Sequence, residues 1–444
     1  MHRPWVARMK TPGPGGCSDA SRPNDESPGS QHRPLSGLRV VDLTQVVSGA
    51  VTTMLLADFG ADVIKVEPLA GEPYRNSGYE LSGTDGSTNL NILRFARGKR
   101  SIALDLKSAG GQEVLRRLIA NADILVENFR PGVLGRLGFD RETLEQLNAG
   151  LIYTTVSGFG HDDLYDSPYR DRPAYAIITE AMAGLMHLAG DGTGRPIWMG
   201  FAMADIFAGT LAFAGTLLSL LDRPTGKGRR VDIAMYDGAL FMNDLALALQ
   251  SMVGETLGPG QYLLQSPWGP FESQDGYVVI AVLTQRQWES LSEIIERPDL
   301  KSDERMRTGL DRSVHHVEVV EPAIASWCKS RSKADATERL LAGGVPAAPL
   351  STSQDIMNCP QVRARNMLVD VSAPAVGTAR VVGNPIKLDG VADGAAMRVP
   401  QLGEHTEAVL RESLGMSDVE IDALVRDRAV GVMPAASAPG PTAS

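Results

Sequence analysis

The sequence predicts an α/β fold with a parallel sheet, followed by a smaller α+β domain. Short β-branched runs alternate with apolar helical segments in the first half of the chain, beginning with Arg39–Leu43, Val51–Phe59 and Asp62–Glu67. A strand, a helix and a second strand in this order form a βαβ unit, which pairs its two strands in parallel. After Gly254, Gly- and Pro-rich stretches separate a new set of strands and helices, which indicates a second domain.

The first domain continues with the same alternation. Further strands are expected at Ser101–Leu106, Asp123–Val126, Leu151–Val156 and Arg229–Met235. Further helices are expected at Gly111–Ala122, Pro173–Leu188, Met203–Leu221 and Tyr236–Val253. In open α/β sheets the loops at the carboxyl ends of the strands face the ligand crevice, so Glu127–Gly132 is a candidate binding loop.

The smaller domain is expected to mix strands and helices. A strand at Gly276–Leu283 precedes helices at Gln285–Ile295 and Val317–Leu341, and a turn and strand follow at Gly343–Leu350. Outside this domain, two further helices are expected at Glu407–Leu414 and Ser417–Asp427, in the carboxyl-terminal part of the large domain.

Changes of composition set the expected domain boundaries. Residues 1–34 and 431–444 are poor in aliphatic side chains and are predicted to be disordered tails. The large domain is expected to comprise 35–253 and 383–430, with a linker at 254–275 and the small domain with a return linker at 276–382.

Charge and cysteine content exclude several classes of protein. The 444 residues carry a formal net charge of −10, which argues against a nucleic-acid binder. The three cysteines are too few and too scattered for a disulfide framework, so a reducing cytosol is the expected setting. The most apolar run, Ile206–Leu221, is short for a bilayer and contains Gly209 and Gly215, so we expect it to lie in a protein core.

Asp205 is the candidate functional carboxylate. It is the only ionisable residue in the apolar segment Met203–Leu221, and it falls in the first turn of the expected helix. Burying a lone acid is costly, but the free N–H groups of a helix start can hold it in the charged form. From the residues alone, Asp205 is either the cap of a core helix or the reactive group of a site.

A dinucleotide site at the first βα turn is not favoured. Glu67 ends the second strand, where a ribose-binding acid would lie, but the turn lacks the G-x-G-x-x-G pattern. Gly49 stands alone in this turn, so the backbone lacks the glycines that let a pyrophosphate approach.

Six segments together resemble the family III CoA-transferases, the group of formyl-CoA:oxalate and carnitine CoA-transferases. They occur in the order of the family and lie at Leu35–Thr44, Ala61–Pro68, Gly98–Lys107, Asp123–Gly132, Gly135–Phe139 and Leu402–Thr406. The resemblance covers about Leu35 to Val430. It implies a Rossmann-like large domain built from both ends of the chain, a smaller inserted domain, and an interlocked homodimer.

The resemblance also implies a reaction. Asp205, between Gly200 and Gly209, matches the nucleophile of the family. Its carboxylate would attack an acyl-CoA thioester, form a mixed anhydride and release CoA, which then passes to a carboxylic acid acceptor. Acyl-CoA is thus a substrate, and no permanently bound cofactor and no metal are implied.

The CoA-binding positions carry over residue by residue. They are Val47, Leu104, Lys107, Asn128, Phe129, Arg130, Arg136, Arg172 and Tyr175. At Val47 some members carry a Gln that hydrogen-bonds near the reacting carbonyl, and at Pro68 some carry an Arg beside the nucleotide. The Gly-rich lid of the oxalate-using members has no clear counterpart near Pro267–Phe271.

These departures argue against oxalate and formate as substrates. The side chains expected near Asp205 favour a larger or more apolar acyl group; they are Trp198, Phe201, Met203 and Phe207.

Two alternative functions remain open. The fold also houses α-methylacyl-CoA racemases, whose catalytic Asp matches Asp205, but the position of their catalytic His is Tyr175 here. A non-catalytic CoA-binding scaffold is suggested by Ala176, where many members have an acid.

The histidines do not form a recognisable site. His161 is expected in a surface turn, His187 in a core helix, and His405 in a loop that resembles the family's. His315–His316 lacks the further ligands that a metal site needs.

Overall fold

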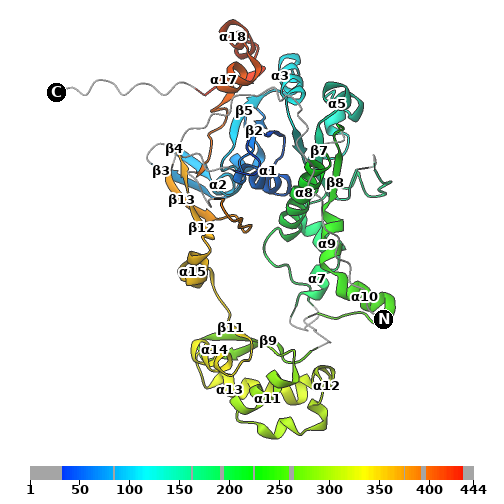
Figure 1. Ribbon diagram of the computed structural model, residues 1–444, viewed down its shortest axis with the longest axis vertical. Helices are drawn as coiled ribbons and strands as arrows, with labels where there is room; N and C mark the ends of the chain where they lie inside the picture. The colour runs from blue at the N-terminus through cyan, green and yellow to red at the C-terminus, as the bar shows by residue number, and fades with distance from the viewer. Residues whose placement is uncertain are drawn as a thin grey trace, which may run out of the picture. The chain divides into compact units, whose positions relative to one another are not determined.

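The computed structural model describes residues 33–83, 86–161, 164–190, 195–223, 226–259, 265–374, 376–391 and 397–433 (Figure 1). Most of the two predicted tails and part of the predicted linker lie outside these ranges. Within them, the largest sheet has the strand order β15-β5-β2-β1-β6-β7-β8. The strands are β1 (Arg39–Asp42), β2 (Asp62–Glu67), β5 (Arg100–Leu104), β6 (Ile124–Glu127), β7 (Ile152–Ser157), β8 (Arg230–Ala234) and β15 (Val430–Gly431).

Parallel pairing confirms the predicted βαβ organisation. All neighbouring pairs from β5 to β8 are parallel, and β15 alone adds antiparallel to β5 in the described sheet. β1 lies between β2 and β6, so the strand order reverses direction at β1. Loops that leave the carboxyl ends of strands at such a reversal diverge and open a crevice.

Helices cover both faces of this sheet, which gives a three-layer α/β arrangement. On one face, strand residues such as Val41 pack with residues of α3 (Ala109–Ala120), α5 (Arg141–Leu147) and α18 (Asp418–Arg426). On the other face, Val40 and its counterparts pack with α1 (Ser48–Asp58) and α8 (Met203–Leu221). Neighbouring strand residues point to opposite faces, so Val40 and Val41 belong to different cores.

Gly209 allows α8 to lie directly against α1. A Cβ atom at this position would stand 2.3 Å from the carbonyl oxygen of Ser48, so only glycine fits. The Thr52 hydroxyl donates a hydrogen bond to the Gly209 carbonyl at 2.9 Å and ties the two helices together. In the described chain, α8 is also the one helix whose length and composition would suit a membrane span. One face of α8 packs against α1 and strands β7 and β8, while apolar side chains on it such as Leu218 and Leu221 are exposed.

Three helices that the sequence predicts as continuous are each broken in two. Pro173–Leu188 contains α6 (Ala176–Met182) and α7 (Leu185–Leu188), because Gly184 adopts a φ of 81° between them. The predicted helix Tyr236–Val253 is divided into α9 (Met235–Met242) and α10 (Asp244–Met252). The predicted helix Val317–Leu341 is divided into α13 (Glu321–Lys329) and α14 (Lys333–Ala342).

The segment around residues 268–349 forms a separate core. It contains the antiparallel strands β9 (Trp268–Ser273), β10 (Gly276–Ala281) and β11 (Ala347–Pro349), which pack with α11 (Gln285–Ile294), α13 and α14. β9 lies within the range 254–275 that the sequence analysis assigns to a linker.

A further hairpin has its own core. β12 (Leu368–Ala373) pairs with β13 (Gly377–Val382) and with β14 (Met397–Arg398), and the three strands pack on α2 (Leu90–Phe95). The sequence analysis expects no strands here. The remaining short elements are η1 (Pro73–Arg75), β3 (Glu80–Gly83), β4 (Gly86–Asn89), α4 (Val133–Arg136), η3 (Pro298–Lys301), η4 (Glu304–Met306), α12 (Gly309–Val314), η5 (His316–Val320), α15 (Ser353–Asn358), α16 (Pro360–Ala364), α17 (Thr406–Ala408) and η6 (Val409–Ser413).

Candidate active site

A cavity of about 400 Å³ lies at the carboxyl ends of the central strands. The loop after β1 contributes residues 45–48, the loop after β6 contributes 128–131, and the end of β7 contributes 156–158. Asp205 reaches the same cavity from the first turn of α8. The cavity therefore occupies the crevice that the reversal of strand order at β1 creates.

Most of the predicted site residues line this cavity. Those that do are Val47, Asn128, Phe129, Arg130, Arg172, Tyr175 and Asp205. The other three do not: Leu104 is buried in β5, Lys107 is exposed beyond that strand, and Arg136 is exposed at the end of α4. Ser48 and Arg170 also line the cavity, and sequence reasoning did not single them out.

Asp205 holds its proton more tightly than an ordinary aspartate. Burial, followed in size by the negative charge of the nearby Glu180, raises the pKa of Asp205 to about 7. A hydrogen bond from Ser48 lowers the pKa but does not outweigh these two effects. A carboxylate with such a pKa is more basic and hence a better nucleophile once it is deprotonated.

The first turn of α8 differs from the expectation of the sequence analysis. Free N–H groups were expected to stabilise the charged form of Asp205. Instead, the neighbouring Ala204 N–H donates to Glu180 Oε1 at 3.0 Å. Glu180 is a lone acid in the apolar helix α6, which is the same pattern that marks Asp205 in the sequence.

Asn128 clamps the loop after β1 to the loop after β6. Its Oδ1 accepts the Gln45 N–H at 2.8 Å, and its Nδ2 donates to the Gln45 carbonyl at 2.8 Å and to Ser48 Oγ at 3.2 Å. Asn128 therefore fixes Ser48, which in turn hydrogen-bonds Asp205.

Val46 in this loop has a φ of 64°, which is unusual for a β-branched residue. Its N–H donates to Glu72 Oε2 at 2.8 Å, and Glu72 Oε1 forms an ion pair with Lys65 at 2.8 Å. Lys65 Nζ also donates to the Thr44 carbonyl at 2.9 Å. The strained turn is thus held by a buried acid and a buried cation.

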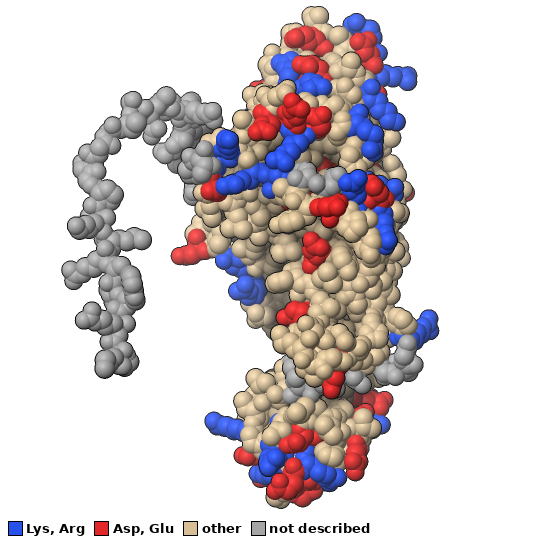
Figure 2. Space-filling view, turned by 90° about the vertical axis from the view of Figure 1, so that its right-hand side faces the viewer, with Lys and Arg blue, Asp and Glu red and all other residues tan. Residues whose placement is uncertain are grey.

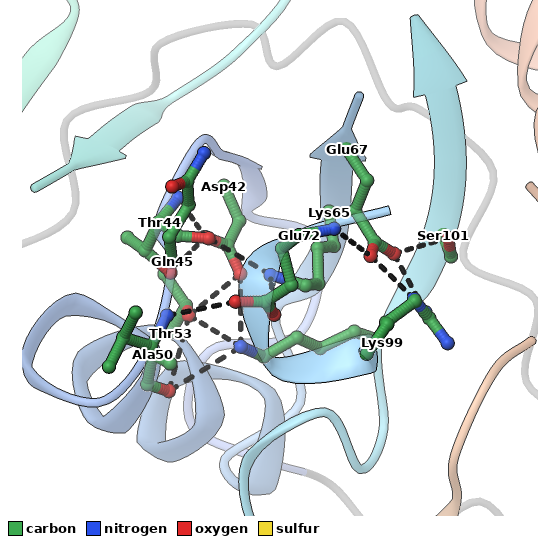
Figure 3. Close-up of polar contacts among 12 residues, drawn as sticks. Asp42, Thr44, Gln45, Ala50, Thr53, Lys65, Glu67, Glu72, Lys99 and Ser101 are labelled. Atoms are coloured by element: carbon green, nitrogen blue, oxygen red, sulfur yellow. Dashed lines mark hydrogen bonds and ion pairs between the residues drawn. The ribbon is translucent and has the colours of Figure 1, made fainter. Parts of the chain in front are cut away.

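A second buried pair lies beneath the same loop (Figure 3). Lys99 Nζ contacts Asp42 Oδ2 at 2.9 Å and Thr53 Oγ1 at 2.7 Å, and both charged side chains are fully buried. Burial alone would raise the pKa of Asp42, but the charges of Lys99 and Lys65 outweigh it and lower the pKa. The acid is therefore held in its charged form.

Glu127 anchors the other side of the cavity. It accepts the Phe129 N–H at 2.6 Å and the Tyr153 hydroxyl at 2.9 Å. Burial raises the pKa of Glu127 to about 7, although these two hydrogen bonds lower it. The backbone of the predicted CoA-binding loop is therefore hydrogen-bonded to a buried acid at the end of β6.

The histidines of the described ranges lie away from the cavity. None of them lines the cavity. His405 accepts the Ser101 N–H at 3.2 Å, which fits a structural role, and no cluster of possible metal ligands occurs among the described residues.

Comparison with known proteins identifies the family. The sequence profile of the CoA-transferase family III matches residues 35–406. The chain belongs to this family.

Named relatives and a solved structure match most of the chain. The β subunit of succinyl-CoA–L-malate CoA-transferase from Chloroflexus aurantiacus is 35% identical over 89% of this chain and 98% of its own length. Succinyl-CoA:mesaconate CoA-transferase from Haloarcula hispanica is also 35% identical, over 87% of this chain and 99% of its own. A CAIB/BAIF family protein from Brucella suis, 31% identical, superposes with a TM-score of 0.76 over 86% of this chain and all of its own.

These relatives favour a transferase over the two alternative functions. A formyl-CoA:oxalate CoA-transferase from Rhodopseudomonas palustris is 34% identical over 87% of this chain and 95% of its own length. The family members are enzymes that use acyl-CoA as a substrate, so the chain is assigned as a CoA-transferase.

Lys65→Met should destabilise the protein by about 3–5 kcal/mol, because it leaves the buried Glu72 without its cation. Urea unfolding at fixed protein concentration measures this. Lys329→Met is the matched control, since Lys329 and its partner Glu272 are both exposed, and its effect should be about 0–1 kcal/mol. If both variants lowered the free energy of unfolding equally, Lys65 would not be needed to stabilise the buried Glu72.

Asp205→Asn should stabilise the protein at pH 8. An aspartate whose pKa is about 7 when folded and near 3.8 when unfolded favours unfolding as the pH rises from 4 to 7, by at most about 4 kcal/mol. The gain in melting temperature should thus be largest above pH 7 and vanish towards pH 4. Asp166→Asn, at an exposed position, should show no such trend, and a gain independent of pH in Asp205→Asn would rule out the raised pKa.

Proposed function

We propose that this enzyme transfers CoA from an acyl-CoA to a carboxylic acid through Asp205. The observation that carries the proposal is the position of Asp205 in a cavity whose walls are the two loops predicted to bind CoA. The charged form of Asp205 attacks the thioester carbonyl carbon; an Oδ–C bond forms, the C–S bond breaks, and the CoA thiolate leaves. The product is a mixed anhydride on the enzyme.

The return steps use the same groups. The thiolate attacks the Asp205 carbonyl carbon of the anhydride, which releases the first acid and leaves a thioester between Asp205 and CoA. The acceptor carboxylate attacks this thioester to form a second anhydride, and the thiolate then takes the new acyl group. Each step exchanges one acyl bond for another, so no oxidant or reductant is needed.

CoA binding is assigned to the loops on both sides of Asp205. Arg130 is exposed at the cavity, and no described acid forms an ion pair with it, so its guanidinium is available to an anion. Phe129 offers an apolar face to the thiol arm. Lys107 and Arg136 do not line the cavity, and we propose that they contact the nucleotide end of CoA.

The acyl groups are proposed to be those of short acids with a second polar group. Two of the relatives are named for succinyl, malate and mesaconate and a third for formyl and oxalate, and Arg170 and Arg172 line the cavity beside Asp205. The aromatic side chains expected to favour a larger apolar group, Trp198 and Phe201 among them, do not line this cavity.

The functional unit is proposed to be an interlocked homodimer with a Rossmann-like large domain, located in the cytoplasm. The strand order supports the fold, and large exposed apolar side chains on α8 and α9, such as Leu221 and Phe241, support a covering partner. Figure 2 shows a broad area of one face with few charged side chains. A monomer in sedimentation velocity would exclude the dimer.

Asp205→Ala should abolish covalent transfer, because the nucleophile is removed. After incubation with formyl-, acetyl- and succinyl-CoA and hydroxylamine trapping, mass spectrometry should find an adduct on Asp205 in the wild type and none in the variant. Turnover should fall by about 10³-fold or more. Retained turnover, or an adduct at another residue, would reject Asp205 as the nucleophile.

Arg130→Met should weaken CoA binding by about tenfold, since a charge-assisted contact to an anion is lost. Isothermal titration calorimetry with CoA measures this. Arg141→Met changes an exposed arginine outside the cavity and should leave the affinity unchanged. If both variants bound CoA with the same affinity, Arg130 would not belong to the CoA site.

A further inference from the structure

Glu180 is a buried acid beside the proposed nucleophile, and it does not line the cavity. Only 2% of its surface is exposed. It lies on α6, and Ala176 of this helix and Ala183 directly after it pack in one cluster with Ala204 of α8 and Ala239 of α9. Because these side chains are small, α6 approaches α8 closely and Glu180 reaches the first turn of α8.

Both oxygens of Glu180 have defined partners. Oε1 accepts the Ala204 N–H at 3.0 Å, and Oε2 accepts the indole N–H of Trp198 at 3.0 Å. The carboxylate therefore joins the segment that precedes α8 to the first turn of that helix. Ala204 is adjacent to Asp205 in the chain, so the orientation of Glu180 is fixed relative to Asp205.

We propose that Glu180 is a positioning residue for Asp205: its carboxylate holds the first turn of α8, and its fixed negative charge acts on the Asp205 carboxylate. The catalytic part of this inference rests on the proposed function.

The charge has a consequence for the first chemical step. Before the reaction, two carboxylates lie close together and repel each other. When the Oδ–C bond forms and the C–S bond breaks, the negative charge leaves Asp205 and ends on the CoA thiolate. The repulsion is then relieved, so Glu180 destabilises the free enzyme more than the acyl-enzyme and favours the attack.

Other groups also face Asp205. Tyr74 on η1 and Ser48 on α1 interact with it, and Arg130, Arg170 and Arg172 line the same cavity. The test therefore changes Glu180 alone in charge and leaves these groups in place.

The first experiment is a double-mutant cycle on stability. Glu180→Gln removes the charge and keeps an oxygen that can accept the Ala204 N–H. The new side-chain NH₂ group would face the indole N–H of Trp198, and both are donors. Every protein of the cycle therefore also carries Trp198→Phe, which removes the indole N–H. At pH 8 the gain in melting temperature from Asp205→Asn should fall by about a third in the Glu180→Gln background, because burial still raises the pKa of Asp205 there. Trp198→Phe alone should leave that gain unchanged. An equal gain with and without the Glu180 charge would overturn the inference, because a purely structural acid would give this result.

The second experiment reads the same coupling during catalysis. The acidic limb of kcat/KM should reflect ionisation of Asp205, and its midpoint should move down by about one pH unit in Glu180→Gln. Trp198→Phe should not move it. Coupling in the stability cycle with an unmoved limb would support the charge interaction and reject Asp205 as the reacting group. A limb moved equally by Trp198→Phe would overturn the inference.

Discussion

The cavity that contains Asp205 depends on a group of charges buried beneath the loop after β1. Asp42, Lys65, Glu72 and Lys99 are all almost completely shielded from water, and each forms an ion pair within the group. Removing one of them would leave a charge in the interior with no partner, at a cost far greater than that of a surface pair. The backbone of Thr44 and of Val46 is hydrogen-bonded to this group, so the buried charges fix this wall of the cavity.

Much of the fold follows from local sequence patterns. β-branched runs such as Asp62–Glu67 indicated the strands, and alternation with helices indicated parallel pairing, because both signals arise within a few residues. The family motifs led to Asp205 and to the loop at Asn128, which the structure brings into one cavity. The assignment of domain boundaries and of individual CoA contacts stays a prediction.

Other features depend on contacts between distant segments and gave no local signal. The helix expected at Pro173–Leu188 is broken because Gly184 adopts a left-handed conformation, although an isolated glycine is often tolerated within a helix. Glu180 carries no motif, and its hydrogen bond with the first turn of α8 forms only when α6 packs on α8. The donors expected to stabilise the charge of Asp205 are partly occupied by this second acid, so the sequence led to the residue but not to its surroundings.

The conformation of Val46 has a consequence for the evolution of the protein. A β-branched residue with a φ of 64° costs free energy that folding elsewhere must supply. A glycine at this position would relieve the strain but would also free the loop that carries Val47 and Ser48. Evolution at this position therefore sets backbone strain against the order of the loop that lines the cavity.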